Sequence, residues 1–367
     1  MGHHGYRSRL TQGLTQPASL ETLSGTEWDL LIEEARGAGL LARIYALLEE
    51  EQLLDAIRIQ PRKHLESAHI IAQNEQRILR WELNRLKRAL EDTGVPIVLL
   101  KGAAYLVLNL PIARGRISSD IDILVPNEKI SVVENALLER GWEHIKLDEY
   151  DQYYYRTWSH ELPPLRHRER QTIVDVHHSI LPLTGRLHPN PEKLLEAALS
   201  VAGTSLKVLC PSDMVLHSAA HAFQDGDLQR GLRDLVDLDD LLRHFGSDSG
   251  FWDQLMMRAE ELELSRPLYY GLHYSSLVLG TPIPDCVLSQ KFSWKPIWPV
   301  TVLMDRLVAG ILRPRPSKNR GFGSVLSGWL LYIRSLWLRM PPWLLARHLA
   351  RKCIKQMGWF DEARREK

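Results

Sequence analysis

Two short apolar runs place the strongest constraint on how this chain can fold. They are VPIVLL at 95–100 and IDILV at 121–125, and each ends at a turn signal, Lys101-Gly102 or Pro126-Asn127. Continuous runs of this length that are rich in β-branched residues are typical of strands buried inside a sheet. Two further segments, 150–158 and 172–177, also have strand-like composition. The sequence therefore predicts an α/β unit built on a small mixed sheet.

The rest of the chain has the periodicity of helices. Apolar residues recur at helical spacing before residue 93, with a long amphipathic helix expected over 62–92 and ended by Gly94 and Pro96. Helices are expected again at 192–201, 211–223, 228–245, 250–263 and 266–279. We therefore expect an N-terminal helical region at 1–93, an α/β core at 94–203, a helical domain at 204–312 and a C-terminal tail at 313–367.

Composition limits the class of protein and its compartment. The 367 residues include only three cysteines, at 210, 286 and 353, in no zinc-binding spacing, which suits a reducing compartment such as the cytoplasm. We expect neither a signal peptide nor a transmembrane span. Neither a P-loop motif nor a GxGxxG motif occurs, which argues against a P-loop kinase and a dinucleotide-binding fold.

The C-terminal tail is basic and rich in tryptophan. Although the net charge is only +1, residues 313–367 hold 13 Lys and Arg against three Asp and Glu. Within 325–360, four tryptophans (Trp329, Trp337, Trp343 and Trp359) alternate with basic residues. This pattern is typical of a helix that lies in a membrane interface. The favoured alternative is a helical hairpin that packs on the acidic body, which predicts buried tryptophans.

Acidic residues give the clearest indication of chemistry. Asp120 and Asp122 lie two residues apart on a predicted strand, so both side chains point to one face while Ile121 and Ile123 point to the other. Two carboxylates on one face repel each other unless a cation lies between them. Mg²⁺ with oxygen ligands would meet that need. Asp175, on the predicted strand at 172–177, could supply a third carboxylate.

These motifs together resemble a known family. The set Leu100-Lys101-Gly102, Arg116, Asp120-Ile121-Asp122 and Val174-Asp175-Val176-His177 resembles the bacterial family described as uncharacterised nucleotidyltransferases. That family lies within the superfamily typified by DNA polymerase beta and the aminoglycoside nucleotidyltransferases. The resemblance covers about residues 60–245, including His221 and the LRDL segment at 232–235.

The resemblance implies an enzyme that uses two Mg²⁺ ions, with Mn²⁺ able to substitute. Asp120, Asp122 and Asp175 would be both the catalytic residues and the metal ligands, in a two-metal nucleotidyl transfer. The expected nucleotide-binding residues are Lys101, Gly102, Arg116, Ser119 and Arg233. His177 and His221 would contact the acceptor or support the site.

The sequence thus predicts transfer of an NMP from an NTP, with ATP as the default, to a hydroxyl-type acceptor, with release of pyrophosphate. The acceptor could be a small molecule, a peptide or a protein, and no specific nucleic acid is expected. Two alternatives stay open. One is a catalytically silent protein on the same fold that binds a nucleotide or a partner, and the other is a peripheral membrane adaptor that acts through 325–360.

Overall fold

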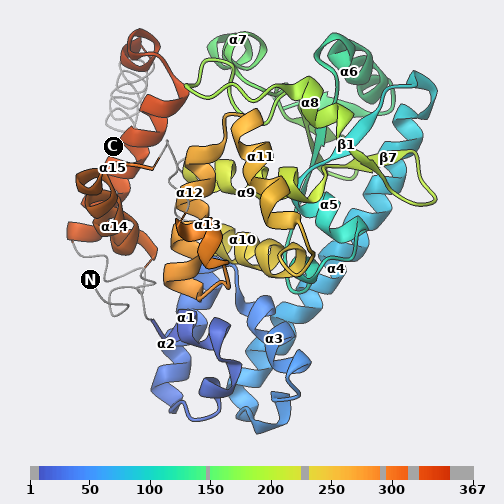
Figure 1. Cartoon of the computed structure of the whole chain (residues 1–367). Coiled ribbons are helices and arrows are strands. Elements are labelled where there is room, and N and C mark those ends of the chain that lie inside the picture. Colours follow the sequence, from blue (N-terminus) through green and yellow to red (C-terminus); the bar gives the residue numbers. More distant parts are fainter. Residues whose placement is uncertain (1–7, 146–148, 225–230, 290–294, 313–321, 348–367) are drawn as a thin grey trace, which may run out of the picture.

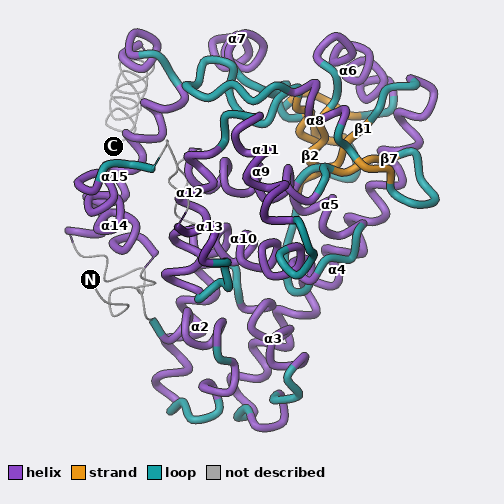
Figure 2. The backbone as a smooth tube through the Cα atoms, in the orientation of Figure 1, coloured by secondary structure: helices purple, strands orange, loops and turns teal. Residues whose placement is uncertain are grey.

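A computed structural model describes residues 8–145, 149–224, 231–289, 295–312 and 322–347. Among these residues, seven strands form one mixed sheet, and most of the remainder is helical. Figure 2 shows the strands gathered in one part of the molecule, with helices over the rest. The expected fold class, an α/β core flanked by helical regions on both sides of the sequence, is confirmed.

The sheet has the order β3-β4-β5-β2-β1-β7-β6. The β2–β5 and β1–β7 pairs are parallel and the other four pairs are antiparallel. The strands are β1 (Ile97–Leu99), β2 (Asp120–Leu124), β3 (Trp142–His144), β4 (Leu165–His167), β5 (Ile173–His177), β6 (Leu199–Ser200) and β7 (Leu206–Val208). The expected runs at 95–100, 121–125 and 172–177 correspond to β1, β2 and β5, three strands that lie side by side.

Besides a helical segment at 342–347, fifteen α-helices are found in the described parts of the chain (Figure 1). They are α1 (Arg9–Thr15), α2 (Gly25–Ala38), α3 (Leu41–Glu50), α4 (Ile59–Leu90), α5 (Lys101–Val107), α6 (Ile130–Glu139), α7 (Glu149–Trp158), α8 (Pro191–Glu196), α9 (Pro211–Gln224), α10 (Gly231–Phe245), α11 (Phe251–Glu261), α12 (Ser265–Tyr274), α13 (Asp285–Ser289), α14 (Trp298–Leu312) and α15 (Phe322–Arg339). The long helix expected over 62–92 is α4, which runs from the N-terminal helices to the sheet in Figure 1.

The expectation of a strand at 150–158 is wrong, because α7 occupies this segment. Aromatic residues are frequent in strands, but that preference depends on what the side chains pack against. Tyr154 and Trp158 are four residues apart, so a helix brings them to one face. There both pack against a small apolar cluster of Leu336, Met340 and Leu344. Contact with this C-terminal segment, which is distant in sequence, thus stabilises the helix.

The described residues form two large apolar cores. One lies around the sheet and includes residues of α4, α5, α6, α9 and α11. The other joins α1–α3 to helices that come much later in the chain, through residues such as Leu10, Leu31, Leu232, Tyr270 and Leu331. The division of the chain at residues 93, 203 and 312 stays a prediction. The sheet itself continues past residue 203, since β7 pairs with β1.

The tail packs on the body but keeps its tryptophans at the surface. Helix α15 contacts α9 and α14, and the Arg334 guanidinium donates to the Phe223 carbonyl oxygen at 2.8 Å. Trp329, Trp337 and Trp343 are nevertheless 57%, 45% and 61% exposed. The expectation that a packed tail buries its tryptophans is therefore wrong for these three, and Trp359 lies outside the described residues. In the described parts of the chain, every helix is too short or too polar to cross a bilayer.

Candidate active site

Pairing of β2 with β5 brings the predicted carboxylates together. The strands are parallel, with Asp122 directly opposite Asp175 and Asp120 opposite Ile173. Because side chains alternate along a strand and register partners share a face, Asp120, Asp122 and Asp175 lie on the same face of the sheet. Ile121 and Ile123 are fully buried on the other face. The three acidic residues that the sequence predicted would form the site thus share one face of two adjacent strands, and their role as metal ligands stays a prediction.

Asp122 is the buried centre of this group. Its Oδ1 lies 3.7 Å from Nζ of Lys101 and 3.0 Å from Nε2 of His177. Burial alone would raise the pKa of Asp122, but the charges and hydrogen bond of Lys101 and His177 outweigh it and hold the pKa well below its usual range. Asp122 is therefore a carboxylate at neutral pH, and it is held in place by two basic side chains.

Asp175 differs from Asp122 because it lacks a compensating partner. Its Oδ1 is buried and has no hydrogen-bond partner among the described residues. Burial, followed by the negative charges of Asp122 and Glu161, raises the pKa of Asp175 to about 7. An orphaned carboxylate oxygen beside two further carboxylates is the arrangement that a divalent cation with oxygen ligands would stabilise. The donor set therefore fits Mg²⁺.

The turn after β1 brings Lys101 and Gly102 to this site. Lys101 begins α5 with a φ of +42°, in the left-handed region that non-glycine residues seldom adopt. Its side chain is thereby placed beside Asp122. Gly102 packs so closely against Ser118 and Arg116 that a Cβ atom at this position would collide with both side chains. Gly102 is thus required for the loop before β2 to lie against α5.

Two arginines hold that loop to α10. The Arg116 guanidinium lies over the Tyr105 ring and donates through Nε to Oδ2 of Asp237 at 2.9 Å. The Arg233 guanidinium donates to the carbonyl oxygen of Ile117. Ser119, between this loop and Asp120, is exposed. Among the expected nucleotide-binding residues, Lys101 lies directly at the carboxylates, whereas Arg116 and Arg233 contact the protein around them.

We expect Arg116→Ala to destabilise the protein by about 3–5 kcal/mol, since it would leave the buried Asp237 carboxylate without its cation. Arg114→Ala is the matched control, because Arg114 and its partner Glu50 are both more than half exposed and such pairs contribute less than about 1 kcal/mol. Urea unfolding of both variants measures the difference. Equal effects of the two substitutions would mean that the Arg116–Asp237 pair does not hold the loop.

Histidines surround the carboxylates, and the sequence indicated only some of them. His177 lies on β5 two residues after Asp175, and burial, which alone would lower its pKa, is outweighed by Asp122 and Glu161, which raise it. His217 on α9 is buried, and burial and the charge of Lys101 hold its pKa well below the usual range. The partly buried His221, one turn later, acts electrostatically on His217 and on Asp234 of α10.

Four residues near the site were not among the predicted site residues: Ser118, His160, Glu161 and His217. The first three lie in loops, where no periodicity indicates which side chains point inwards. His217 had one usable signal, because its spacing of four from His221 puts both residues on one face of a helix.

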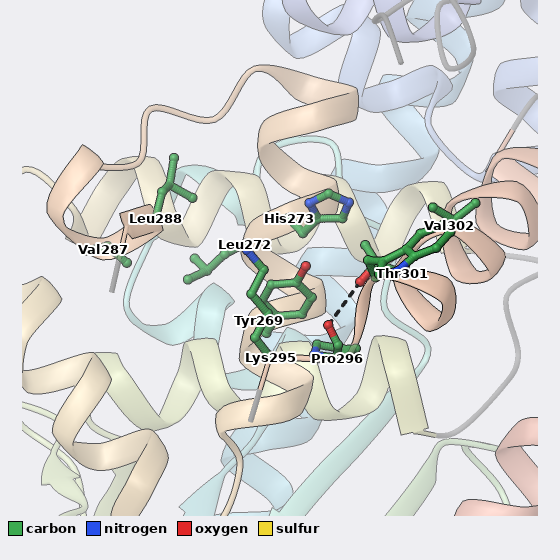
Figure 3. Close-up of a pocket in the computed structure, with 10 residues that line it drawn as sticks. Tyr269, Leu272, His273, Val287, Leu288, Lys295, Pro296, Thr301 and Val302 are labelled. Carbon is green, nitrogen blue, oxygen red and sulfur yellow. Dashed lines mark hydrogen bonds between the residues drawn. The ribbon is translucent and has the colours of Figure 1, made fainter. Parts of the chain in front are cut away.

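A separate cavity of about 410 Å³ lies between α12, α13 and α14 (Figure 3). Apolar side chains such as Leu272, Val287 and Val302 line much of it, and Tyr269 and His273 stack with ring centroids 5.8 Å apart. Its lining shares no residue with the carboxylate group on β2 and β5. We therefore do not include it in the candidate active site.

A mixed sheet in which an Asp-x-Asp strand lies beside a parallel strand with a third Asp has the features expected of a nucleotidyltransferase core. The chain belongs to the family described as "Uncharacterised nucleotidyltransferase", whose sequence model matches residues 24–280. The comparison with curated proteins gives no match.

One similar solved structure is that of an antigenic nucleotidyltransferase-like protein from Paracoccidioides brasiliensis. The match has 14% sequence identity and a TM-score of 0.33, and it covers 58% of this chain and 97% of that one. So loose a superposition has no bearing on the site.

Proposed function

We propose that this protein is a Mg²⁺-dependent nucleotidyltransferase that moves an NMP from an NTP to a hydroxyl-type acceptor. The observation that carries the proposal is the in-register pairing of Asp122 with Asp175, with Asp120 on the same face of the sheet. In the reaction, the acceptor oxygen bonds to the α-phosphorus while the bond to the bridging α–β oxygen breaks. Pyrophosphate leaves, and the hydroxyl proton passes to a base.

The metal ligands in this proposal are Asp120, Asp122 and Asp175. Divalent ions held there would neutralise the triphosphate and lower the pKa of the acceptor hydroxyl. Two Mg²⁺ ions are proposed, with Mn²⁺ as a substitute. The buried Oδ1 of Asp175, which has no hydrogen-bond partner among the described residues, supports this assignment.

The chain's own groups can neutralise charge and accept a proton. Lys101, 3.7 Å from Asp122, is near enough to the carboxylates to pair with a phosphate oxygen as a point charge. Asp175 is placed to help accept the proton of the acceptor hydroxyl, because it faces the same side of the sheet as Asp122 on the neighbouring strand. Much of the catalysis would come from positioning and charge neutralisation.

The remaining predicted residues have supporting parts in this proposal. Gly102 and Arg116 hold the loop before β2 against α5 and α10, and Arg233 fixes the Ile117 carbonyl three residues before Asp120. The exposed Ser119 is free to contact the nucleotide. In this proposal His221 contacts the acceptor, and His177 positions Asp122 through the hydrogen bond between them.

The test is incubation of the full chain with each of the four labelled NTPs and Mg²⁺, with and without a cell lysate as a source of acceptors. A labelled product that requires Mg²⁺ and the protein supports the proposal, and ATP is the NTP expected to give it. Nucleotide binding without any product in all four reactions would instead support the catalytically silent alternative. We place the reaction in the cytoplasm, because the chain has only three cysteines, at 210, 286 and 353, in no zinc-binding spacing, which suits a reducing compartment.

The exposed face of α15 favours a second candidate activity, docking on an anionic membrane surface. Trp329, Trp337 and Trp343 present large aromatic rings to solvent, and Trp343 also contacts Trp158 of α7 edge-on. Basic residues accompany them, since Arg186 stacks over Trp337 and Arg347 is exposed. Arg334 is excluded from this surface because it is directed into the body.

We therefore expect the full chain to bind vesicles that contain anionic lipid at low salt and to be released at high salt. Basic residues near the surface contribute about 1 kcal/mol each, and 0.1 M salt screens charges over about 10 Å. The double variant Trp329→Ala and Trp343→Ala should bind at least about tenfold more weakly, whereas Ile70→Ser, at an exposed position on α4, should not. Co-sedimentation at two salt concentrations measures this, and a wild-type chain that ignores anionic vesicles at low salt contradicts it.

A further inference from the structure

Beside the carboxylates lies a second group of side chains with different chemistry. His160, Glu161 and His177 each offer one ligand atom, and these atoms all lie within 4.8 Å of one another. His177 ends β5, while His160 and Glu161 follow α7 in sequence. Two imidazoles and one carboxylate differ from the all-carboxylate set of Asp120, Asp122 and Asp175, because imidazole is a ligand for transition metals rather than for Mg²⁺.

Main-chain hydrogen bonds hold this group in place. Glu161 pairs with His177 as an antiparallel bridge, and the amide of Leu162 donates to the Val176 carbonyl oxygen at 2.9 Å. The amide of His178 donates to the carbonyl oxygen of His160 at 2.9 Å. The 160–162 segment is therefore attached to the end of β5 through an isolated bridge, so the three side chains are positioned by paired backbone.

The distances between the ligand atoms suit a metal ion. Nδ1 of His177 lies 3.3 Å from Oε2 of Glu161, and this buried nitrogen has no hydrogen-bond partner in the described part of the chain. Ligands at about 2.1 Å from a tetrahedral zinc ion lie about 3.4 Å from one another. The His160 and His177 rings have centroids 5.3 Å apart. Glu161 is 21% exposed, which leaves the site in contact with solvent.

The second nitrogen of His177 connects this group to the candidate active site. Nε2 lies 3.0 Å from Oδ1 of Asp122. A histidine that ligates a metal through one nitrogen usually donates its other N–H to a carboxylate, which fixes the tautomer and the ring orientation. An ion on Nδ1 would therefore require a proton on Nε2, directed at Asp122.

We propose that His160, Glu161 and His177 bind one divalent transition-metal ion, with Zn²⁺ the best match, at a site separate from the three aspartates. Solvent completes the coordination. The ion positions Asp122 through His177, so that the carboxylate keeps one orientation. The binding site itself does not depend on the proposed nucleotidyl transfer. In the absence of the ion, a proton shared among His177, Asp122 and Glu161 would be the alternative way to satisfy the two carboxylates.

The experiment uses the full chain, stripped with a chelator and titrated with Co²⁺ in excess Mg²⁺. Co²⁺ is a probe for a zinc-type site because its visible absorption reports its ligands. One Co²⁺ per chain is expected after dialysis, measured by elemental analysis and by absorption. Glu161→Gln and His160→Ala should each weaken binding by more than about 100-fold, because each removes a direct ligand. Glu161→Gln preserves size and shape, so it remains informative if His160→Ala does not fold.

Two controls separate this site from others. His188→Ala removes an exposed histidine elsewhere and should leave Co²⁺ binding unchanged. Asp120→Asn and Asp175→Asn should also retain one Co²⁺, whatever they do to transfer activity. The proposal is overturned if the wild-type chain retains no Co²⁺ in the presence of Mg²⁺, or if Glu161→Gln binds it as well as the wild type. Loss of Co²⁺ binding in Asp120→Asn would also overturn the proposal, because it would show that the aspartates bind the ion.

Discussion

Asp122→Asn is expected to lower nucleotidyl transfer by about 10³-fold or more while the fold persists. Asp122 is the most buried of the three carboxylates and lies between Lys101 and His177. A water molecule can therefore replace its carboxylate as a metal ligand less easily than it can replace the other two. Loss of a metal ligand removes several kcal/mol of transition-state stabilisation, and about 4 kcal/mol corresponds to 10³ in rate. Initial rates of NMP transfer at saturating Mg²⁺ measure the effect, with circular dichroism to confirm the fold.

The matched control is Asp253→Asn, an exposed carboxylate on α11. It should transfer at the wild-type rate. Asp122→Asn should also be about 1–3 kcal/mol less stable without metal, because the hydrogen bond to His177 and the attraction to Lys101 are weakened. An Asp122→Asn protein as active as the wild type would contradict the two-metal proposal.

The second large effect concerns Asp175 and pH. The pKa of Asp175 is about 7 in the folded protein, against an ordinary value of 3.8. Between these values the folded state keeps a proton that the unfolded chain has released. Stability therefore falls as pH rises through this window, and the full penalty is present above pH 7. From pH 5 to pH 8 the loss amounts to about 2 to 3 kcal/mol.

Asp175→Asn abolishes this titration. Without metal, the free energy of unfolding of the variant should therefore rise relative to the wild type by the same amount between pH 5 and pH 8. Urea unfolding in a chelating buffer at both pH values measures it. Asp253→Asn again provides the control, with no pH-dependent difference expected. A difference between wild type and Asp175→Asn that is constant with pH would show that burial and the charges of Asp122 and Glu161 do not raise the pKa of Asp175.

The central part of the fold could be predicted from the sequence because its signals are local. β1, β2 and β5 are buried and β-branched, and α4 has a continuous apolar stripe. The short strands β3, β4, β6 and β7, each of two or three residues, gave too few residues for a pattern. The segment at 150–158 was misassigned because its structure depends on residues near 340, which no local pattern can reveal.

For the site, the sequence indicated which residues carry charge but not how those charges are paired. Asp120 and Asp122 share a face by strand geometry alone, and Asp175 was added from its place on a later predicted strand and from the family resemblance. The partner of Arg116, Asp237 on α10, lies 121 residues away, so only the structure could show that this guanidinium contacts α10. His160 and Glu161 are brought to the site by backbone pairing with β5. No sequence pattern around residues 160 and 161 indicates this pairing.

The core shared by α1–α3 and the later helices bears on how the chain folds during its synthesis. Leu10 and Leu31 leave the ribosome early, whereas their core neighbours Tyr270 and Leu331 are added some 240 to 320 residues later. At about 5–20 residues per second, the nascent N-terminal helices wait roughly 15–60 s for those partners. During that interval the part of their apolar surface that packs on the later helices has no native partner to cover it. Chaperones that shield nascent chains should therefore matter more for this protein than for one whose N-terminal segment folds by itself.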